Sequence, residues 1–487
     1  MHPLYRQRRG GVLLHPTSLP GPLPRGQICH DAYRFIEWLQ QCGIGVWQML
    51  PLGPTHQDSS PYLALSAHAG DPKLISLDWL RDRHMLSNCP EVMDFQTHQQ
   101  QLERAWKQFS KKKDRRLLQT WQQFKRDESD WLDDYSLFMA LREQQGGDAW
   151  HHWPAALRDR DAATLKQTRD NLAERIEFHQ FCQFIFFQQW QDLKAYAADN
   201  KVLLFGDMPI YVSYDSADVW AQRELFTLDS QGHPQQVAGV PPDYFSETGQ
   251  RWGNPLYRWD IMEQDHFQWW QRRLQTQLQL FDIVRIDHFR GLQAYWSIPA
   301  KEETAIKGHW INAPGAKLLA ALHTAFPNLP LVAEDLGMIT EEVHVLRETF
   351  DLPGMKILQF AFDGDPNNSY LPHQHEFHSL VYTGTHDNDT SLGWYQQLPT
   401  ETQNYIRDYL GLKTDREMPW PLIRCALASV SCLAVIPMQD LLALGSEYRM
   451  NTPGTIEGNW QWRFDWPQVP DELIQKLRHL LHLYGRL

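Results

Sequence analysis

Residues 282–287, with the sequence DIVRID, form a short apolar and β-branched run that ends in a carboxylate. Seven further runs of this character lie along the chain, and amphipathic helical stretches separate them. They are residues 11–15, 45–51, 202–207, 331–334, 355–360, 380–385 and 433–438. Eight such βα units close into a barrel more readily than they form an open sheet, so the sequence predicts an α/β protein with a (β/α)₈ TIM-barrel fold.

Two segments interrupt this alternation and are predicted to be insertions into one catalytic barrel that spans residues 1–487. Residues 78–175 have helical periodicity and no strand-like run, so we expect a helical subdomain after the second strand. Residues 208–259 are expected to form a loop-rich insertion over the active site after the third strand. Their last part, residues 236–259, is rich in Gly, Pro and aromatic residues, and long irregular loops in compact domains are usually functional. A purely structural loop is the alternative.

The composition argues against a polyanionic partner. The chain has 487 residues and a formal net charge of −13, whereas binding to nucleic acid depends on Lys and Arg that neutralise phosphates. The basic run at residues 111–116 is therefore interpreted as a solvated helix face. The 21 tryptophans suit a sugar site, because flat rings stack on pyranose faces, although most of them should fill the core.

The six cysteines are scattered without metal-ligand spacing, which is typical of buried thiols in a reducing compartment. No apolar run approaches the ~18 residues that a membrane span needs, and the N-terminal segment lacks a signal-peptide core. We therefore expect a cytoplasmic protein without a membrane partner. His373, His375 and His378 are the one candidate metal-ligand cluster, and we interpret them as exposed loop residues, so no metal is expected.

Three acidic residues lie at or just after the carboxyl ends of predicted strands, where barrels build their active sites: Asp287, Glu334 and Asp387. Each one alone is explained equally well as a helix N-cap or a turn residue. On three strands of one barrel, however, they would converge over its mouth. Cleavage of a glycosidic bond needs such a cluster, with one carboxylate as nucleophile and one carboxylic acid to protonate the leaving oxygen.

The surroundings of these residues suggest their roles. Arg285 lies two residues before Asp287 on the same strand face, and a guanidinium keeps a neighbouring carboxylate ionised, so Asp287 is the candidate nucleophile. An ordinary salt bridge would explain this pair too. Glu334 is the candidate acid/base, because partial burial and nearby negative charges would raise its pKa. Asp387 would hold sugar hydroxyls and stabilise the transition state.

Several motifs carry a resemblance to a known family. The segments RIDHF, AEDLG and THDN, in this order, resemble the signature regions of the α-amylase clan. Longer stretches are similar to the amylomaltase or disproportionating-enzyme family of 4-α-glucanotransferases, glycoside hydrolase family 77. They are residues 47–66, 206–221 (GDMPIYVSYDSADVWA), 236–259, 282–292 (DIVRIDHFRGL) and 450–463 (MNTPGTIEGNWQWR). The resemblance covers about residues 9–465.

The resemblance implies transfer of α-1,4-glucan segments from a donor maltosaccharide to an acceptor glucose or glucan, by a retaining double displacement and without a cofactor. By motif, Asp287 is the nucleophile, Glu334 the acid/base and Asp387 the third carboxylate. The same resemblance places six further side chains at the sugar subsites: Tyr62, Asp207, Trp252, Arg285, Phe360 and His386. His288, beside the nucleophile, is a candidate to bind hydroxyls or, alternatively, a packing residue.

The nearest alternative is an α-amylase-like α-1,4-glucan hydrolase with the same carboxylates and water as the acceptor. Two features favour the transferase. Roughly 50 residues follow the eighth strand, which are too few for a C-terminal β-sandwich domain. The aromatic loop at residues 236–259 could also shield a glycosyl-enzyme from water. A non-catalytic glucan-binding protein would usually have lost one of the carboxylates. We expect a monomer or a weak homodimer.

Overall fold

The computed structural model describes residues 2–90, 92–111, 115–242, 246–414, 417–455 and 457–487. Its main sheet contains eight parallel strands, and each predicted run supplies one of them. They are β1 (Arg9–Leu13), β2 (Val46–Gln48), β3 (Leu203–Pro209), β6 (Ile283–Asp287), β9 (Leu331–Ala333), β10 (Gly354–Ile357), β11 (Ser379–Tyr382) and β12 (Leu433–Pro437).

These eight strands are neighbours in chain order, and β12 pairs with β1. The remaining gap lies between β9 and β10, where the Ala333 N–H donates to the carbonyl of Pro353 at 3.0 Å. The sheet therefore closes on itself, and the (β/α)₈ prediction is confirmed.

Side chains along each barrel strand point alternately outward and inward, so they form one hydrophobic layer outside the sheet and one inside it. In β3, Leu204 packs with the outer cluster between sheet and helices, whereas Phe205 packs with the cluster inside the barrel. Val12 and Leu13 of β1 divide in the same way. Both faces of each strand are thus buried, which explains why these strands are nearly continuous apolar runs in the sequence.

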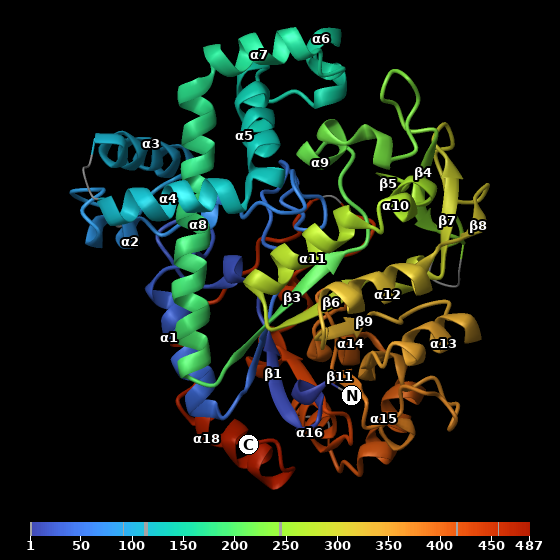
Figure 1. Ribbon diagram of the computed structural model, residues 1–487. Coiled ribbons are helices and arrows are strands. Elements are labelled where there is room, and N and C mark those ends of the chain that lie inside the picture. The colour runs from blue at the N-terminus through green and yellow to red at the C-terminus, as the bar shows by residue number, and fades with distance from the viewer. Residues whose placement is uncertain (1, 91, 112–114, 243–245, 415–416, 456) are drawn as a thin grey trace.

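Helices surround the barrel (Figure 1). They are α1 (His30–Cys42), α8 (Ala173–Asp199), α11 (Gln268–Leu280), α12 (Gly315–Ala325), α13 (Glu341–Thr349), α15 (Thr400–Leu410), α16 (Trp420–Ala428) and α18 (Glu472–Leu483). In α1, Phe35, Trp38, Leu39 and Cys42 recur at helical spacing and are buried, and the helix ends at Gly43 in the left-handed conformation. Among the helices of the described ranges, none combines the length and apolarity that crossing a membrane requires.

Helices also fill the chain between β2 and β3. They are α2 (Leu77–Asp82), α3 (Phe95–Lys111), α4 (Arg115–Asp127), α5 (Ser129–Gln144), α6 (Ala155–Arg158) and α7 (Ala162–Asn171). The predicted limit at residue 175 falls inside α8, a single helix that runs from this helical region down along the barrel (Figure 1). Of the basic run, residues 112–114 lie outside the described residues, and Lys111, Arg115 and Arg116 are exposed. The division into domains stays a prediction.

A second sheet lies beside the barrel, and the sequence did not predict it. It is antiparallel, in the order β5-β4-β7-β8, with β4 (Gln236–Val240), β5 (Gln250–Pro255), β7 (Ala294–Pro299) and β8 (His309–Asn312). The expectation of an irregular loop at residues 236–259 is therefore wrong for β4 and β5, whereas residues 243–245 lie outside the described residues. Local composition gives no sign of β4, because this strand is stabilised by pairing with β7, and β7 comes only after the next barrel strand, β6.

The described residues also form the shorter helices α9 (Ala217–Ala221), α10 (Trp259–Gln264), α14 (Ser391–Gln397) and α17 (Met438–Leu441). The part of the chain after β12 that the structure describes contains helical turns and ends with α18 (Figure 1).

Candidate active site

An arginine joins two carboxylates across neighbouring barrel strands. The register of β3 and β6 places Asp207 beside Arg285 and Pro209 beside Asp287. Arg285 Nη1 lies 2.5 Å from Asp207 Oδ2, and its Nη2 lies 2.9 Å from Asp287 Oδ1. The guanidinium is buried, so these charge-assisted contacts fix its position firmly.

Glu334 follows β9 and meets the backbone immediately after Asp287. Its Oε2 accepts a hydrogen bond from the His288 N–H at 2.7 Å, and its Oε1 accepts one from the Leu336 N–H at 3.0 Å. His288 has a φ of 52°, in the left-handed region, which is uncommon for a non-glycine residue. The structure therefore brings Asp287 and Glu334 together, as the two strand ends predicted.

Burial dominates the electrostatics of this pair. Loss of hydration raises the pKa of Asp287 to about 8, and the Arg285 guanidinium opposes this rise only in part. Loss of hydration likewise raises the pKa of Glu334. The Arg285 guanidinium is shared with Asp207, so it offsets the effect of burial on the pKa of Asp287 only in part, and the ionised state of Asp287 stays a prediction. The charge of Glu334 also raises the pKa of Asp287, so a proton on Glu334 favours the ionised form of Asp287.

Asp387 reaches the site from a loop after β11. Its side chain is 48% exposed, and its Oδ1 lies 3.3 Å from His386 Nε2. Asn451 Nδ2 donates to the same oxygen at 2.6 Å, and Arg449 Nη2 donates to the backbone carbonyl of Asp387 at 2.9 Å. Arg449 and Asn451 were not predicted as site residues, although Asn451 lies in the stretch at residues 450–463 that carries part of the family resemblance.

An aromatic wall stands beside these carboxylates. The Tyr62 hydroxyl donates to Asp207 Oδ2 at 2.7 Å, and the Tyr62 ring stacks on His386 with 5.1 Å between centroids. Trp460 lies 5.9 Å from the Tyr62 ring and 6.0 Å from His386. Trp460 was also missed, and the signal that could have found it is the density of tryptophan in residues 450–463.

The second sheet adds Trp252 to this site. Trp252 lies on β5 and meets the His288 ring edge-on, with 4.8 Å between centroids. Burial lowers the pKa of His288 to about 4, so this imidazole is neutral at physiological pH. Its Nε2 is buried and, among the described residues, has no hydrogen-bond partner.

Phe360 follows β10 and is 37% exposed at the same end of the barrel. Its ring meets Tyr370 edge-on at 5.6 Å, and within the described residues it makes no ring contact with Tyr62, His386 or Trp252. Its place in a sugar subsite stays a prediction.

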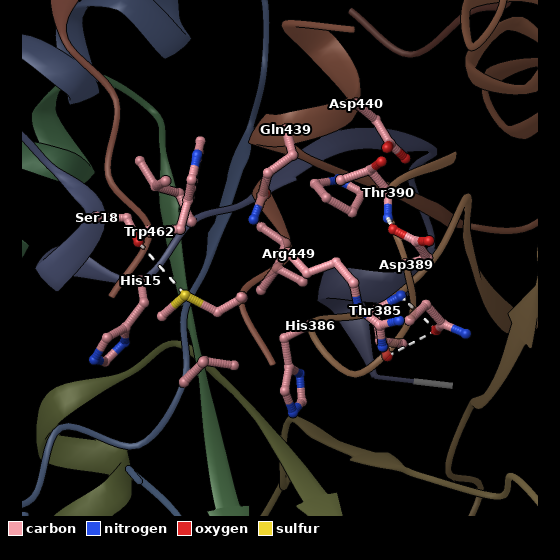
Figure 2. A pocket seen from close by; sticks show the side chains of 16 residues that line it. His15, Ser18, Thr385, His386, Asp389, Thr390, Gln439, Asp440, Arg449 and Trp462 are labelled. Atoms are coloured by element: carbon pink, nitrogen blue, oxygen red, sulfur yellow. Dashed lines mark hydrogen bonds between the residues drawn. The ribbon is translucent and has the colours of Figure 1, made fainter. Parts of the chain in front are cut away.

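A pocket that His386 lines adjoins the site (Figure 2). It lies between the carboxyl ends of β1, β11 and β12, and Asp287 and Glu334 do not line it. Its polar lining consists of His15, Ser18, Thr385, His386, Asn388, Asp389, Thr390, Gln439, Asp440 and Arg449.

Across the described ranges, no group of three or more His, Cys, Asp or Glu side chains is arranged to hold a metal ion. The interpretation of three exposed loop histidines is wrong for His375, which is buried between the Ser429 hydroxyl at 2.7 Å and the Tyr370 carbonyl at 2.8 Å. His373 is exposed and His378 is half-buried.

Comparisons with known proteins agree with this geometry. The family described as 4-alpha-glucanotransferase matches residues 14–468. The chain is 46% identical over 496 residues to the 4-alpha-glucanotransferase of Thermus thermophilus, covering 99% of both chains. It is 43% identical to the chloroplastic/amyloplastic 4-alpha-glucanotransferase of Solanum tuberosum, covering 99% of this chain and 87% of that one.

Among solved structures, the fold matches amylomaltase from Streptococcus agalactiae in complex with acarbose, with a TM-score of 0.95, 37% identity and coverage of 99% of this chain and 100% of that chain. It also matches amylomaltase from Corynebacterium glutamicum, with a TM-score of 0.76, 18% identity and coverage of 99% and 75%, which supports the fold alone. These findings do not favour the hydrolase alternative. Sequence, site and fold together show that the chain is an enzyme that belongs to the 4-alpha-glucanotransferase family.

Proposed function

We propose that this enzyme transfers α-1,4-glucan segments from a donor maltosaccharide to an acceptor glucose or glucan through a covalent glycosyl-aspartate. The observation that carries this proposal is the unequal surroundings of the paired carboxyls. Asp287 contacts the Arg285 guanidinium and is half-buried, whereas Glu334 is buried and forms no ion pair within the described residues.

This difference decides where the proton of the pair belongs. A cation in direct contact favours the ionised form of a carboxyl more strongly than a cation farther away, and burial favours the neutral form. We therefore assign the negative charge to Asp287 and the proton to Glu334. This is the arrangement that a retaining glycosidase mechanism requires, with an ionised nucleophile beside a protonated acid.

The reaction then proceeds in two displacements. In the first, an Asp287 oxygen attacks the anomeric carbon, the glycosidic C–O bond breaks, and Glu334 gives its proton to the leaving oxygen. In the second, Glu334 takes the proton of an acceptor hydroxyl, whose oxygen attacks the anomeric carbon and releases Asp287. Two inversions at one carbon preserve the α configuration.

The remaining residues bind the sugar around this centre. Asp387 is exposed beside His386, where both can hold sugar hydroxyls as the ring distorts toward the transition state. Tyr62 offers a ring face against the sugar, and Trp252, on β5 of the second sheet, packs against His288, the residue after the nucleophile. Trp252 is placed to restrict water near the glycosyl-enzyme, which favours a sugar acceptor over hydrolysis.

The first test is incubation of the purified protein with maltotriose, with products resolved by chain length and free glucose measured against total reducing ends. We expect a ladder of longer maltosaccharides and free glucose with almost no rise in reducing ends, since transfer conserves the number of glycosidic bonds. Shorter products alone, with rising reducing ends, would contradict the transferase assignment.

Location and assembly are part of the same proposal. We propose a cytoplasmic enzyme that is a monomer or a weak homodimer. All six cysteines are free thiols, which is consistent with a reducing compartment. Sedimentation at several protein concentrations measures the assembly state directly.

A further inference from the structure

A buried carboxylate outside the sugar site holds together the two ends of the loop that carries Asp387. Asp440 lies on α17 and is 1% exposed. Its Oδ2 accepts hydrogen bonds from Thr383 Oγ1 and Ser391 Oγ, both at 2.6 Å, and its Oδ1 accepts one from the Ser391 N–H at 2.7 Å. Thr383 directly follows β11, and Ser391 is the first residue of α14.

The loop between these anchors, residues 384–390, contains His386 and Asp387. It is internally ordered, because Asn388 Oδ1 accepts hydrogen bonds from both the N–H and the hydroxyl of Thr385. Asp389 Oδ2 accepts one from Ser446 Oγ at 2.6 Å. Figure 2 shows Asp440, Thr390 and Asp389 on one side of the pocket, with Thr385 and His386 following below them.

We propose that Asp440 is a positioning residue for glucan transfer: by holding Thr383 and Ser391, it holds the loop that presents Asp387 and His386 to the sugar. This inference rests on the role proposed for Asp387. An exposed side chain on a loop stabilises a transition state only if the loop is held in one position, because small displacements of such groups cost much of their effect.

Burial of the Asp440 carboxylate is energetically unfavourable, which supports a functional reason for an acidic residue at this position. Within the described residues, Asp440 forms no ion pair, so its charge is stabilised by hydrogen bonds alone. Burial raises the pKa of Asp440, while the bonds from Ser391 and Thr383 oppose the rise. A buried carboxylate without a cation is an unfavourable way to fill a core, and an apolar residue would fill it at lower cost.

The hydrogen-bond pattern separates a positioning role from an electrostatic one. In Asp440→Asn, the amide oxygen can accept from the Ser391 N–H, while the two amide N–H groups donate to the hydroxyls of Ser391 and Thr383, which rotate to accept. Asn therefore preserves the connection between the loop ends without the charge. Ala at the same position removes the connection.

The experiment measures kcat and KM of the full-length enzyme for transfer from maltotriose. We expect Asp440→Ala to lower kcat by between about tenfold and 100-fold, with KM within about threefold of wild type. Asp440→Asn should keep kcat within about threefold of wild type. Unchanged kcat in folded Asp440→Ala, or equal losses in the Ala and Asn variants, would overturn the proposal.

The matched control is Asp282→Ala. Asp282 Oδ2 accepts a hydrogen bond from the Leu204 N–H at 2.8 Å and so ties β3 to the start of β6, at the opposite end of the barrel. This variant should lose stability but keep kcat, and a loss of kcat equal to that of Asp440→Ala would mean that any weakened barrel has this effect.

A double-mutant cycle tests whether Asp440 acts through Asp387. With an activated donor such as maltosyl fluoride, Asp440→Ala should change turnover much less in an Asp387→Asn background than in wild type. Additive losses would overturn the proposal. If Asp440→Ala does not fold, Thr383→Val combined with Ser391→Ala removes both hydroxyl donors and should reproduce the loss of kcat, and unchanged kcat there would overturn it.

The same cycle separates this inference from the proposed function. Full turnover in Asp387→Asn alone would contradict the role of Asp387 and thus the proposed mechanism. Lost turnover in Asp387→Asn, with normal turnover in Asp440→Ala, would contradict the positioning role alone.

Discussion

The two parts of the barrel rim that supply carboxyls differ in how they hold them. At β6 and β9, Asp287 ends its strand and Glu334 directly follows its own, and strand register, Arg285 and backbone N–H groups fix both side chains. At β11, Asp387 stands five residues beyond the strand on a loop, is 48% exposed, and is held by hydrogen bonds that Arg449 and Asn451 donate to it.

We infer from this difference that the two parts of the rim have different roles in the reaction. At the ends of β6 and β9, loss of hydration shifts the pKa of both carboxyls upward, which favours a proton on one of them. Asp387, on the loop after β11, remains solvated and offers a charge and hydrogen-bond acceptors to a sugar. We therefore propose that covalent chemistry belongs to Asp287 and Glu334, and that recognition of the distorted sugar belongs to Asp387.

The largest expected loss of kcat follows from changes to Asp287 and Glu334, at the ends of β6 and β9. Asp287→Ala removes the nucleophile and should lower kcat by about 10⁴-fold or more, and Glu334→Gln removes the acid/base and should lower it by about 10²-fold to 10⁴-fold. Circular dichroism should show both variants folded. Substantial turnover of maltotriose in either folded variant would contradict the assignment of covalent chemistry to these two residues.

A change to Asp387, on the loop after β11, should lower kcat less. Asp387→Asn keeps the shape and part of the hydrogen bonding but loses the charge that favours the cationic transition state, so kcat should fall by about 10²-fold to 10³-fold. The measurement is kcat with maltotriose beside Asp389→Asn, an acid in the same loop that bonds Ser446 instead of facing the sugar. A smaller loss in Asp387→Asn than in Asp389→Asn would reverse the assigned roles.

Burial of Glu334 also predicts a pH-dependent stability. Because its pKa is raised in the folded state, the unfolded chain releases a proton that the folded chain retains, so stability falls as pH rises from the ordinary pKa through the raised one. Glu334→Gln removes this titration. Its Tm should exceed that of wild type at neutral pH, and the difference should shrink as pH falls toward about 4. A difference independent of pH would show that Glu334 titrates normally.

The smallest expected effect concerns the acceptor. Trp252→Ala opens the side of the site that the second sheet covers, so the ratio of transfer to hydrolysis should fall a few-fold while total turnover changes little. The readout is reducing ends released for each glucose transferred. Trp296→Ala, in β7 of the same sheet and packed against Trp310, is the control for general damage to the sheet. An unchanged ratio in Trp252→Ala would contradict the shielding role.

The sequence predicted the barrel because each strand has two buried faces, which leaves a local apolar signature. Barrel closure then places all carboxyl ends on one rim, so Asp287, Glu334 and Asp387 could be assigned to one site without coordinates. The second sheet left no such signature. Its strands β4 and β7 lie on either side of β6 in the chain, and their pairing is a long-range event that local composition does not report.

By itself, then, the sequence determined the fold class, the three carboxyls and most of the aromatic and cationic side chains beside them. Tertiary structure alone decided that Arg285 is shared between Asp207 and Asp287, and that burial outweighs this cation in setting the pKa of Asp287. It also brought Arg449, Asn451 and Trp460 to the site. The physical reason is that residue type and strand position are local, whereas burial, ion-pair sharing and loop anchoring depend on which distant segments meet.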